Sequence, residues 1–362
     1  MAEHLVSRRG GLTPAEPPAK PPVHSPNRTS ARGVWYDPLL RAGLARLSPA
    51  GPGARLSITI FHRVHAERDP LFPGEVDQQR FDQICAWLAG WFNVLPLDEA
   101  CRRLADGSLP PRAMAITFDD GYADNCTVAL PILRRHGLPA TFFIATSFLD
   151  GGRMWNDTVI ETVRRSSLAR LDLAGLGLRG LTRVALEGLP ARQAAIGQIL
   201  GATKYLEPGE RLQTVQRIAR LAAVADLPDD LMMSTEQLRS MAAAGMQIGA
   251  HTLSHPILLG LDDAQARDEI VGSKQALEQC LGQPITLFAY PNGRPGTDYS
   301  ARDAALVRAA GFQAAVSTAP GAAQAGADVM QLPRFVPWEQ SRLRWAAKLG
   351  RNLRQPGQVA LA

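Results

Sequence analysis

The sequence has few cysteines and no long apolar run. Its four cysteines lie far apart and form no C-x-x-C pair, so we expect free thiols in a reducing compartment, not a disulfide framework or a zinc knuckle. No segment approaches the roughly 18 consecutive apolar residues of a transmembrane helix. The N-terminus also lacks the apolar core of a secretory signal. These absences predict a cytoplasmic protein.

The central part of the chain also lacks an excess of positive charge. The formal charge of +5 comes from the two ends, because residues 1–50 carry +4 and residues 341–362 carry +5, which leaves −4 between them. We therefore expect no nucleic-acid partner. The first 30 residues hold six prolines among small and polar residues, a composition typical of disorder. We divide the chain into a disordered segment (1–50), one domain (51–340) and a basic C-terminal helix or tail (341–362).

Within the domain, short apolar runs alternate with helical patterns. Strands are expected at 56–61, 93–97, 114–118 and 141–146, then at 246–250, from Ile285 onward and at 312–318, with 332–335 leading towards closure of a barrel. This alternation predicts βα units and a parallel sheet in an α/β fold. It lapses between about 150 and 230, where Leu, Ala and Arg recur at helical spacing. We interpret that stretch as a helical insertion after the fourth strand, in a βα loop at the catalytic face.

Two adjacent carboxylates, Asp119 and Asp120, directly follow the buried run that ends at Phe118. Ligands of α/β folds bind beyond the carboxyl ends of such strands. One carboxylate could bind a metal while the other handles protons. The structural alternative is a tight turn at Gly121 in which Asp120 caps the next helix.

Two histidines, His251 and His255, follow the strand at 246–250 in the same way. A capping or surface role is open for such a pair on its own. Together with a strand-end aspartate, however, it forms a His₂Asp set with open positions for water and substrate. Neutral imidazole favours Zn²⁺, with Co²⁺, Ni²⁺ or Mn²⁺ as alternative ions.

Two further segments are candidate parts of the same site. The turn at Tyr290-Pro291-Asn292-Gly293 follows a strand and can present a backbone N–H to an oxyanion, although it could equally be a simple strand exit. Trp155, at the start of the insertion, could stack on a sugar or anchor an inserted helix. His62, at the end of the first strand, could line the site or be structural.

The blocks TFDDG, HTLSH and FAYPNG, in this order and each after a strand, closely resemble those of the polysaccharide deacetylases, carbohydrate esterase family four. The resemblance covers about residues 55–338. It implies a distorted (β/α)₇ barrel and metal-dependent removal of N- or O-acetyl groups from an acetylated glycan. By motif, it implies that Asp119 is the general base and that the backbone N–H of Asn292 binds the oxyanion. The implied metal ligands are Asp120, His251 and His255.

The chain departs from the family pattern at two places. Many members have an arginine where Ala289 stands, which orients the base, and a histidine general acid in a late L-x-x-H motif. The matching segment here, Leu332-Pro333-Arg334-Phe335, holds no histidine. The chain therefore looks more like the branch that acts on exopolysaccharide or surface polysaccharide. We expect Tyr290, Pro291, Trp155 and Arg334 to contact the substrate.

Two other functions and one other partner remain open from the sequence. The same fold could hydrolyse a small non-peptide amide, or the chain could be a carbohydrate-binding homologue without turnover. In the tail, Leu343, Ala346, Ala347 and Leu353 recur at helical spacing among basic residues. This pattern fits weak contact with an anionic inner-membrane surface, or a closing barrel helix with a solvated basic face. The oligomeric state is not predicted.

Overall fold

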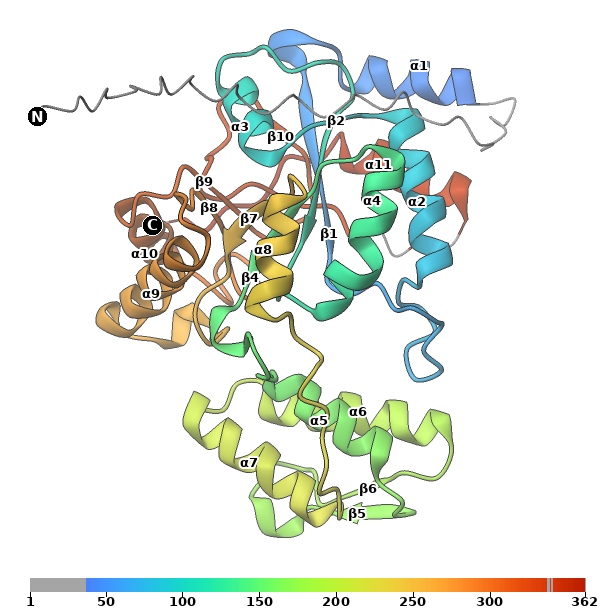
Figure 1. The fold of residues 1–362 in the computed structure, drawn as a ribbon, viewed down its shortest axis with the longest axis vertical. Helices are drawn as coiled ribbons and strands as arrows, with labels where there is room; N and C mark the ends of the chain where they lie inside the picture. Colours follow the sequence, from blue (N-terminus) through green and yellow to red (C-terminus); the bar gives the residue numbers. More distant parts are fainter. Residues whose placement is uncertain (1–36, 337–338, 340, 362) are drawn as a thin grey trace, which may run out of the picture. The chain divides into compact units, whose positions relative to one another are not determined.

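A computed structural model describes residues 37–336, 339 and 341–361. Its main sheet has eight strands in the order β10-β1-β3-β4-β7-β8-β9, with β2 beside the start of β3, and all pairs are parallel except β1 with β10 (Figure 1). The strands are β1 (Arg55–Phe61), β2 (Asn93–Val94), β3 (Ala113–Phe118), β4 (Thr141–Ile144), β7 (Gln247–Ala250), β8 (Leu287–Ala289), β9 (Ala314–Val316) and β10 (Ala323–Gln324). This curled, mostly parallel sheet confirms the α/β class and agrees with a distorted (β/α)₇ barrel.

The segment 332–335 joins the two ends of the parallel sheet. Leu332 forms a parallel bridge with Val316 of β9, and Phe335 forms one with Thr59 of β1. The N–H of Ile60 also donates to the carbonyl of Phe335 at 3.0 Å. The expected approach of this segment to closure is therefore confirmed, and Arg334 lies between the first and last parallel strands.

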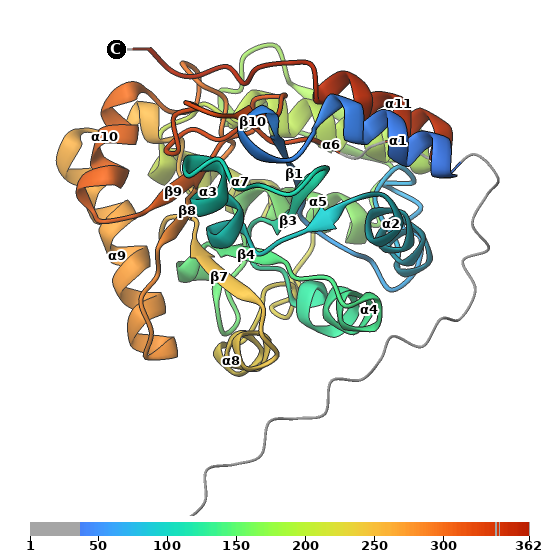
Figure 2. The ribbon, with the colours of Figure 1, turned by 90° about the horizontal axis from the view of Figure 1, so that it is seen from above.

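Helices surround the sheet, as Figure 2 shows. They are α2 (Gln78–Trp91), α3 (Leu97–Ala105), α4 (Leu130–His136), α8 (Thr235–Ala243), α9 (Asp263–Leu281) and α10 (Ala301–Ala309). Every residue of β3 is buried, because helices cover one face and barrel side chains the other. The four cysteines are free thiols, as predicted, and Cys85 and Cys101 are buried.

The stretch between β4 and β7 forms a substructure with its own apolar core (Figure 1, green to yellow). It contains α5 (Trp155–Arg165), α6 (Leu189–Thr203) and α7 (Pro208–Leu221), and also an antiparallel pair of β5 (Arg170–Asp172) and β6 (Arg183–Ala185). Our reading of this stretch as helical missed that pair, because each strand has three residues and buries only the middle one. Leu71, from the loop after β1, joins this core.

The two ends of the described chain pack together. Helix α1 (Asp37–Leu47) lies beside α11 (Arg342–Asn352), as Figure 2 shows, and Arg342 pairs with Asp37 at 2.6 Å. The prediction of disorder for 1–50 is thus wrong for 37–47, where α1 forms and buries Leu44 against the rest of the protein. Residues 1–36 lie outside the described part.

In α11, the apolar face is turned into the protein. Trp345 and Leu349 are fully buried, whereas Leu343 is 58% exposed. This packing agrees with the closing-helix alternative for the tail. Within the described residues, no helix is long and apolar enough to cross a membrane.

Candidate active site

Three loops bring the candidate residues to one edge of the sheet. Asp119 and Asp120 follow β3, His251 and His255 follow β7, and Asn292 follows β8. Because these strands run parallel in one sheet, their carboxyl ends meet at the same rim. All five residues line one cavity of about 360 Å³. The sequence-based grouping of these residues therefore matches their arrangement in space.

Asp120, His251 and His255 have the geometry of an ion site. The Oδ1 atom of Asp120 lies 3.4 Å from the Nε2 atom of each histidine. Ligands held tetrahedrally at 2.0–2.1 Å from zinc would lie about 3.3 Å apart. Asp120 Oδ1 is also buried without a hydrogen-bond partner, which is costly unless a cation satisfies it. The residues therefore fit a divalent ion.

The protonation of the two imidazoles also suits an ion. The Nδ1 atom of His251 lies 2.7 Å from the carbonyl of Ala289 and must donate to it, which leaves Nε2 facing Asp120. Burial lowers the pKa of His255 to about 4, so its imidazole is neutral at pH 7. Burial also lowers the pKa of His251, but the carboxylates of Asp119 and Asp120 outweigh it and raise this pKa. A bound cation would take the place of that proton.

The backbone at the rim is held in strained conformations. Non-glycine residues with positive φ occur at Asp120 (78°), Thr252 (64°), His255 (56°) and Asn292 (58°). Such conformations cost on the order of 1–3 kcal/mol each and persist where the surroundings fix them. The ligands and the turn at Asn292 are therefore positioned in advance. Among the described residues, no hydrogen bond from the Asn292 N–H is found, so this donor is available to an oxyanion.

Asp119 is fixed by a buried ion pair with Arg334. The guanidinium binds both oxygens of the Asp119 carboxylate, at 2.7 Å each, and its Nε donates to the carbonyl of Ser317 at 2.8 Å. Arg334 is fully buried and Asp119 is 2% exposed. Burial alone would raise the pKa of Asp119, but Arg334 and His251 hold it below its usual range. Asp119 is therefore ionised and oriented.

This pair corrects the expected role of Arg334. We predicted substrate contact, but the buried guanidinium does not line the cavity. The guanidinium instead holds the Asp119 carboxylate in one orientation. A hint was present in the sequence, because Arg334 is the one charged residue among the apolar neighbours of the closing segment.

Tyr290 also lies elsewhere than expected. Its side chain is fully buried, stacks on Tyr299 with ring centroids 3.9 Å apart, and donates to the carbonyl of Met330 at 2.8 Å. Pro291 is buried too, and neither residue lines the cavity. Substrate contact by these two side chains is corrected, because the strand directs them into the core before the chain turns at Asn292.

Three further residues with polar or aromatic side chains, Trp155, His62 and Lys204, also line the cavity. Trp155 lines it, with the Arg211 guanidinium 4.9 Å from its ring centroid. His62, at the end of β1, lines it as well, which favours the site over the structural alternative. Lys204, at the end of α6, was not anticipated, because nothing in the local sequence ties the insertion to the rim.

Comparison with known proteins decides the family. The sequence profile of the polysaccharide deacetylases matches residues 106–175 and 186–315, more than half of the chain. The chain belongs to the polysaccharide deacetylase family. It is also 23% identical over 272 residues to the Bacillus subtilis protein YxkH, whose name places it among polysaccharide deacetylases, with 75% of this chain and 67% of that protein covered.

Solved structures of deacetylases share the fold of this family member. The Streptococcus pyogenes deacetylase PplD, in complex with acetate, aligns with a TM-score of 0.54 and 19% identity over 84% of this chain and 99% of its own. IcaB from Ammonifex degensii aligns with a TM-score of 0.53 and 18% identity over 85% and 99%. The resemblance predicted from the three motifs is therefore confirmed, and the polysaccharide deacetylases are hydrolases of carbon–nitrogen bonds other than peptide bonds.

Proposed function

We propose that this polysaccharide deacetylase is a metal-dependent enzyme that removes N-acetyl groups from an exopolysaccharide or cell-surface glycan. The proposal rests on one observation: three side chains that could bind a metal ion lie beside the ionised carboxylate of Asp119, which Arg334 holds in place. Asp120 Oδ1 is 3.4 Å from both imidazoles, and Asp119 Oδ2 is 4.0 Å from His251 Nε2. A site that only binds carbohydrate has no need for this arrangement.

The residues divide the work of hydrolysis. A divalent ion held by Asp120, His251 and His255 would polarise the acetyl carbonyl and activate a water molecule. Asp119, ionised by its pairing with Arg334, accepts the proton from the attacking water. The free N–H of Asn292 donates to the oxyanion that develops on the carbonyl oxygen. Trp155 offers an indole face to the sugar ring.

The leaving amine requires a proton, and His62 is the residue that we assign to donate it. Imidazole is the most frequent general acid of enzymes. His62 lines the same cavity from β1, is exposed there, and lies outside the proposed ligand set. This assignment fills the role left open by the absence of histidine in the segment 332–335.

Acetate release from a panel of acetylated glycans, measured beside the metal content of the purified full chain, tests the proposal. We expect release from N-acetylglucosamine oligomers that stops with a chelator and returns with Zn²⁺. Release only from small non-peptide amides would replace the substrate class. Glycan binding without acetate release by the metal-loaded protein would favour a carbohydrate-binding role.

A further inference from the structure

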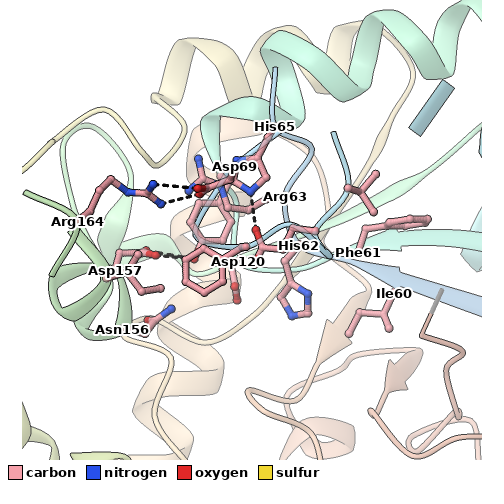
Figure 3. A pocket seen from close by; sticks show the side chains of 15 residues that line it. Ile60, Phe61, His62, Arg63, His65, Asp69, Asp120, Asn156, Asp157 and Arg164 are labelled. Atoms are coloured by element: carbon pink, nitrogen blue, oxygen red, sulfur yellow. Dashed lines mark hydrogen bonds and ion pairs between the residues drawn. The ribbon is translucent and has the colours of Figure 1, made fainter. Parts of the chain in front are cut away.

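The imidazole of His62 makes no contact of its own, although it is our candidate general acid. His62 follows β1, where the active-site cavity meets a second cavity of about 290 Å³. Among the described residues, its ring has no hydrogen bond or ion pair, and Figure 3 shows it without a bond to the other residues drawn. A proton donor needs a free ring, but it also needs a fixed place, since a misplacement of about 1 Å can cost about 100-fold in rate.

Two neighbouring side chains, Asp124 and Asn125, bind the chain around His62. The Nδ2 atom of Asn125 donates to the carbonyl of His62 at 2.8 Å. The Oδ1 atom of Asp124 accepts from the N–H of Val64 at 3.2 Å, and its Oδ2 atom accepts from Nε of Arg63 at 2.7 Å. These bonds hold three consecutive residues, from His62 to Val64, at the rim of the active site.

The amide of Asn125 can take only one favourable orientation. The residue is fully buried, and its Nδ2 atom lies between two acceptors, the carbonyl of His62 and the Oδ1 atom of Asp124 at 3.1 Å. An amide turned the other way would place its oxygen against both of them. The observed orientation is therefore the favourable one, even though Asn125 Oδ1 is left buried without a partner. The bond to His62 thus explains why an amide occupies this position.

Arg63 is also held from the side of the insertion. Its guanidinium lies 4.8 Å from the ring centroid of Tyr122. The hydroxyl of Tyr122 lies 3.1 Å from both oxygens of Asp157 on α5, a contact that Figure 3 shows as a dashed line from Asp157. Asp157 is 4% exposed, and this burial raises its pKa to about 7, although the guanidinium of Arg63 acts to lower it. The residue next to His62 therefore has partners on two sides.

We propose that Asp124 and Asn125 are positioning residues for the general acid. They fix the chain that follows His62, and the N–H of Asp119 fixes the chain before it by donating to the carbonyl of Phe61 at 2.9 Å. His62 then gives its ring proton to the amine nitrogen as the carbon–nitrogen bond breaks. This inference rests on the proposed function. It adds that cleavage of an amide, but not of an ester with a good leaving group, depends on the amide of Asn125.

Steady-state kinetics of the metal-loaded full chain with two substrates test this role. An N-acetylglucosamine oligomer releases an amine, which needs a proton, whereas 4-nitrophenyl acetate releases a phenolate that leaves without one. Asn125→Ala removes the bond to His62. Asn352→Ala is the matched control, because Asn352 is also buried and its Nδ2 atom also donates to a backbone carbonyl, that of Gly321 at 2.8 Å, outside both cavities.

We expect Asn125→Ala to lower kcat for the oligomer about tenfold or more, and to keep the parental metal content and the parental kcat for the aryl ester. His62→Ala should show the same difference between substrates. The two losses should not add in the double variant, because Asn125 acts through His62. Asp124→Ala, which replaces a side chain that is 11% exposed, tests the same role without the fully buried position. Equal losses for both substrates, or additive losses in the double variant, would overturn the positioning role.

Hydrogen exchange of the backbone provides a measurement that does not need turnover. In Asn125→Ala, residues 62–65 should exchange about tenfold faster or more, whereas Asn352→Ala should leave this segment at the parental rate. Parental exchange of this segment in both Asn125→Ala and Asp124→Ala would overturn the positioning role and leave the proposed hydrolysis standing. Absence of acetate release from every glycan by the metal-loaded parent would instead refute the proposed function, and the assignment of a general acid with it.

Discussion

Replacing Arg334 with methionine is the most informative perturbation of the site. The side chain is fully buried and binds both oxygens of Asp119, so its loss leaves a buried carboxylate without a counter-charge. Breaking one side of a buried ion pair costs about 3–5 kcal/mol. We therefore expect Arg334→Met to lower the free energy of unfolding by that amount at pH 7, measured by urea denaturation.

The matched control is Arg308→Met. Arg308 pairs with Asp328 at 3.0 Å, but its side chain is 57% exposed, so solvent screens the interaction. Exposed pairs contribute about 0–1 kcal/mol. The comparison therefore separates the loss of an ion pair in general from the loss of this buried one. Metal content, measured for both variants, shows whether the neighbouring ligands stay in place.

The pH dependence of stability and of kcat/KM provides a second, independent test of the Arg334–Asp119 ion pair. In the parent, the pKa of Asp119 is below its usual range, so the stabilisation is present at neutral pH and is lost as the pH falls through that low pKa. Without Arg334, burial raises the pKa of Asp119, and the carboxylate is protonated at a higher pH. The acid limb of kcat/KM for acetate release should shift to higher pH in Arg334→Met. An acid limb of the kcat/KM profile that is unchanged in Arg334→Met, together with a stability loss under about 1 kcal/mol, would refute the role of Arg334 in holding Asp119 ionised.

Three other outcomes are expected. Asp119→Asn should retain metal and lose turnover, whereas Asp120→Asn and His251→Ala should lose metal, as elemental analysis would show. If Asp119→Asn turned over substrate at the parental rate, Asp119 would not be the general base. Because the pKa of Asp157 is raised to about 7, stability should fall by up to about 1.4 kcal/mol per pH unit from about pH 4 to 7, and Asp157→Asn should flatten that slope in urea denaturation. Truncation after residue 340 should destabilise the protein in thermal unfolding, since α11 buries Trp345, and equal vesicle sedimentation of both chains at low salt would exclude membrane recruitment by the tail.

The grouping of the candidate metal ligands could be predicted from sequence because its signals are local. Asp119 and Asp120 follow an uninterrupted apolar run, and His251 and His255 follow another, so each polar group marks the end of a buried strand. The capping box that begins α8 also has a local signal, since its partners Ser234 and Gln237 are three residues apart.

The rest depended on contacts between distant parts of the chain. Arg334 reaches Asp119 across 215 positions, and only barrel closure brings them together. The inward orientation of Tyr290 could not be predicted, because the sequence does not determine which way side chains point where a strand ends. Asp37 gains order from Arg342 at the far end of the chain, which no local composition reveals.

The closing segment makes burial of the Asp119 carboxylate depend on completion of the barrel, because that segment carries Arg334. When β3 has left the ribosome but residue 334 has not, Asp119 has no counter-charge. Burial of its carboxylate at that stage would cost several kcal/mol, on the order of 3–5. The contact between Arg334 and Asp119 joins residues that are far apart in the sequence. Contacts of this kind form late in folding, because closing a long loop is costly. Formation of the last parallel bridge should therefore complete the fold and allow the Asp119 carboxylate to be buried in its ionised form.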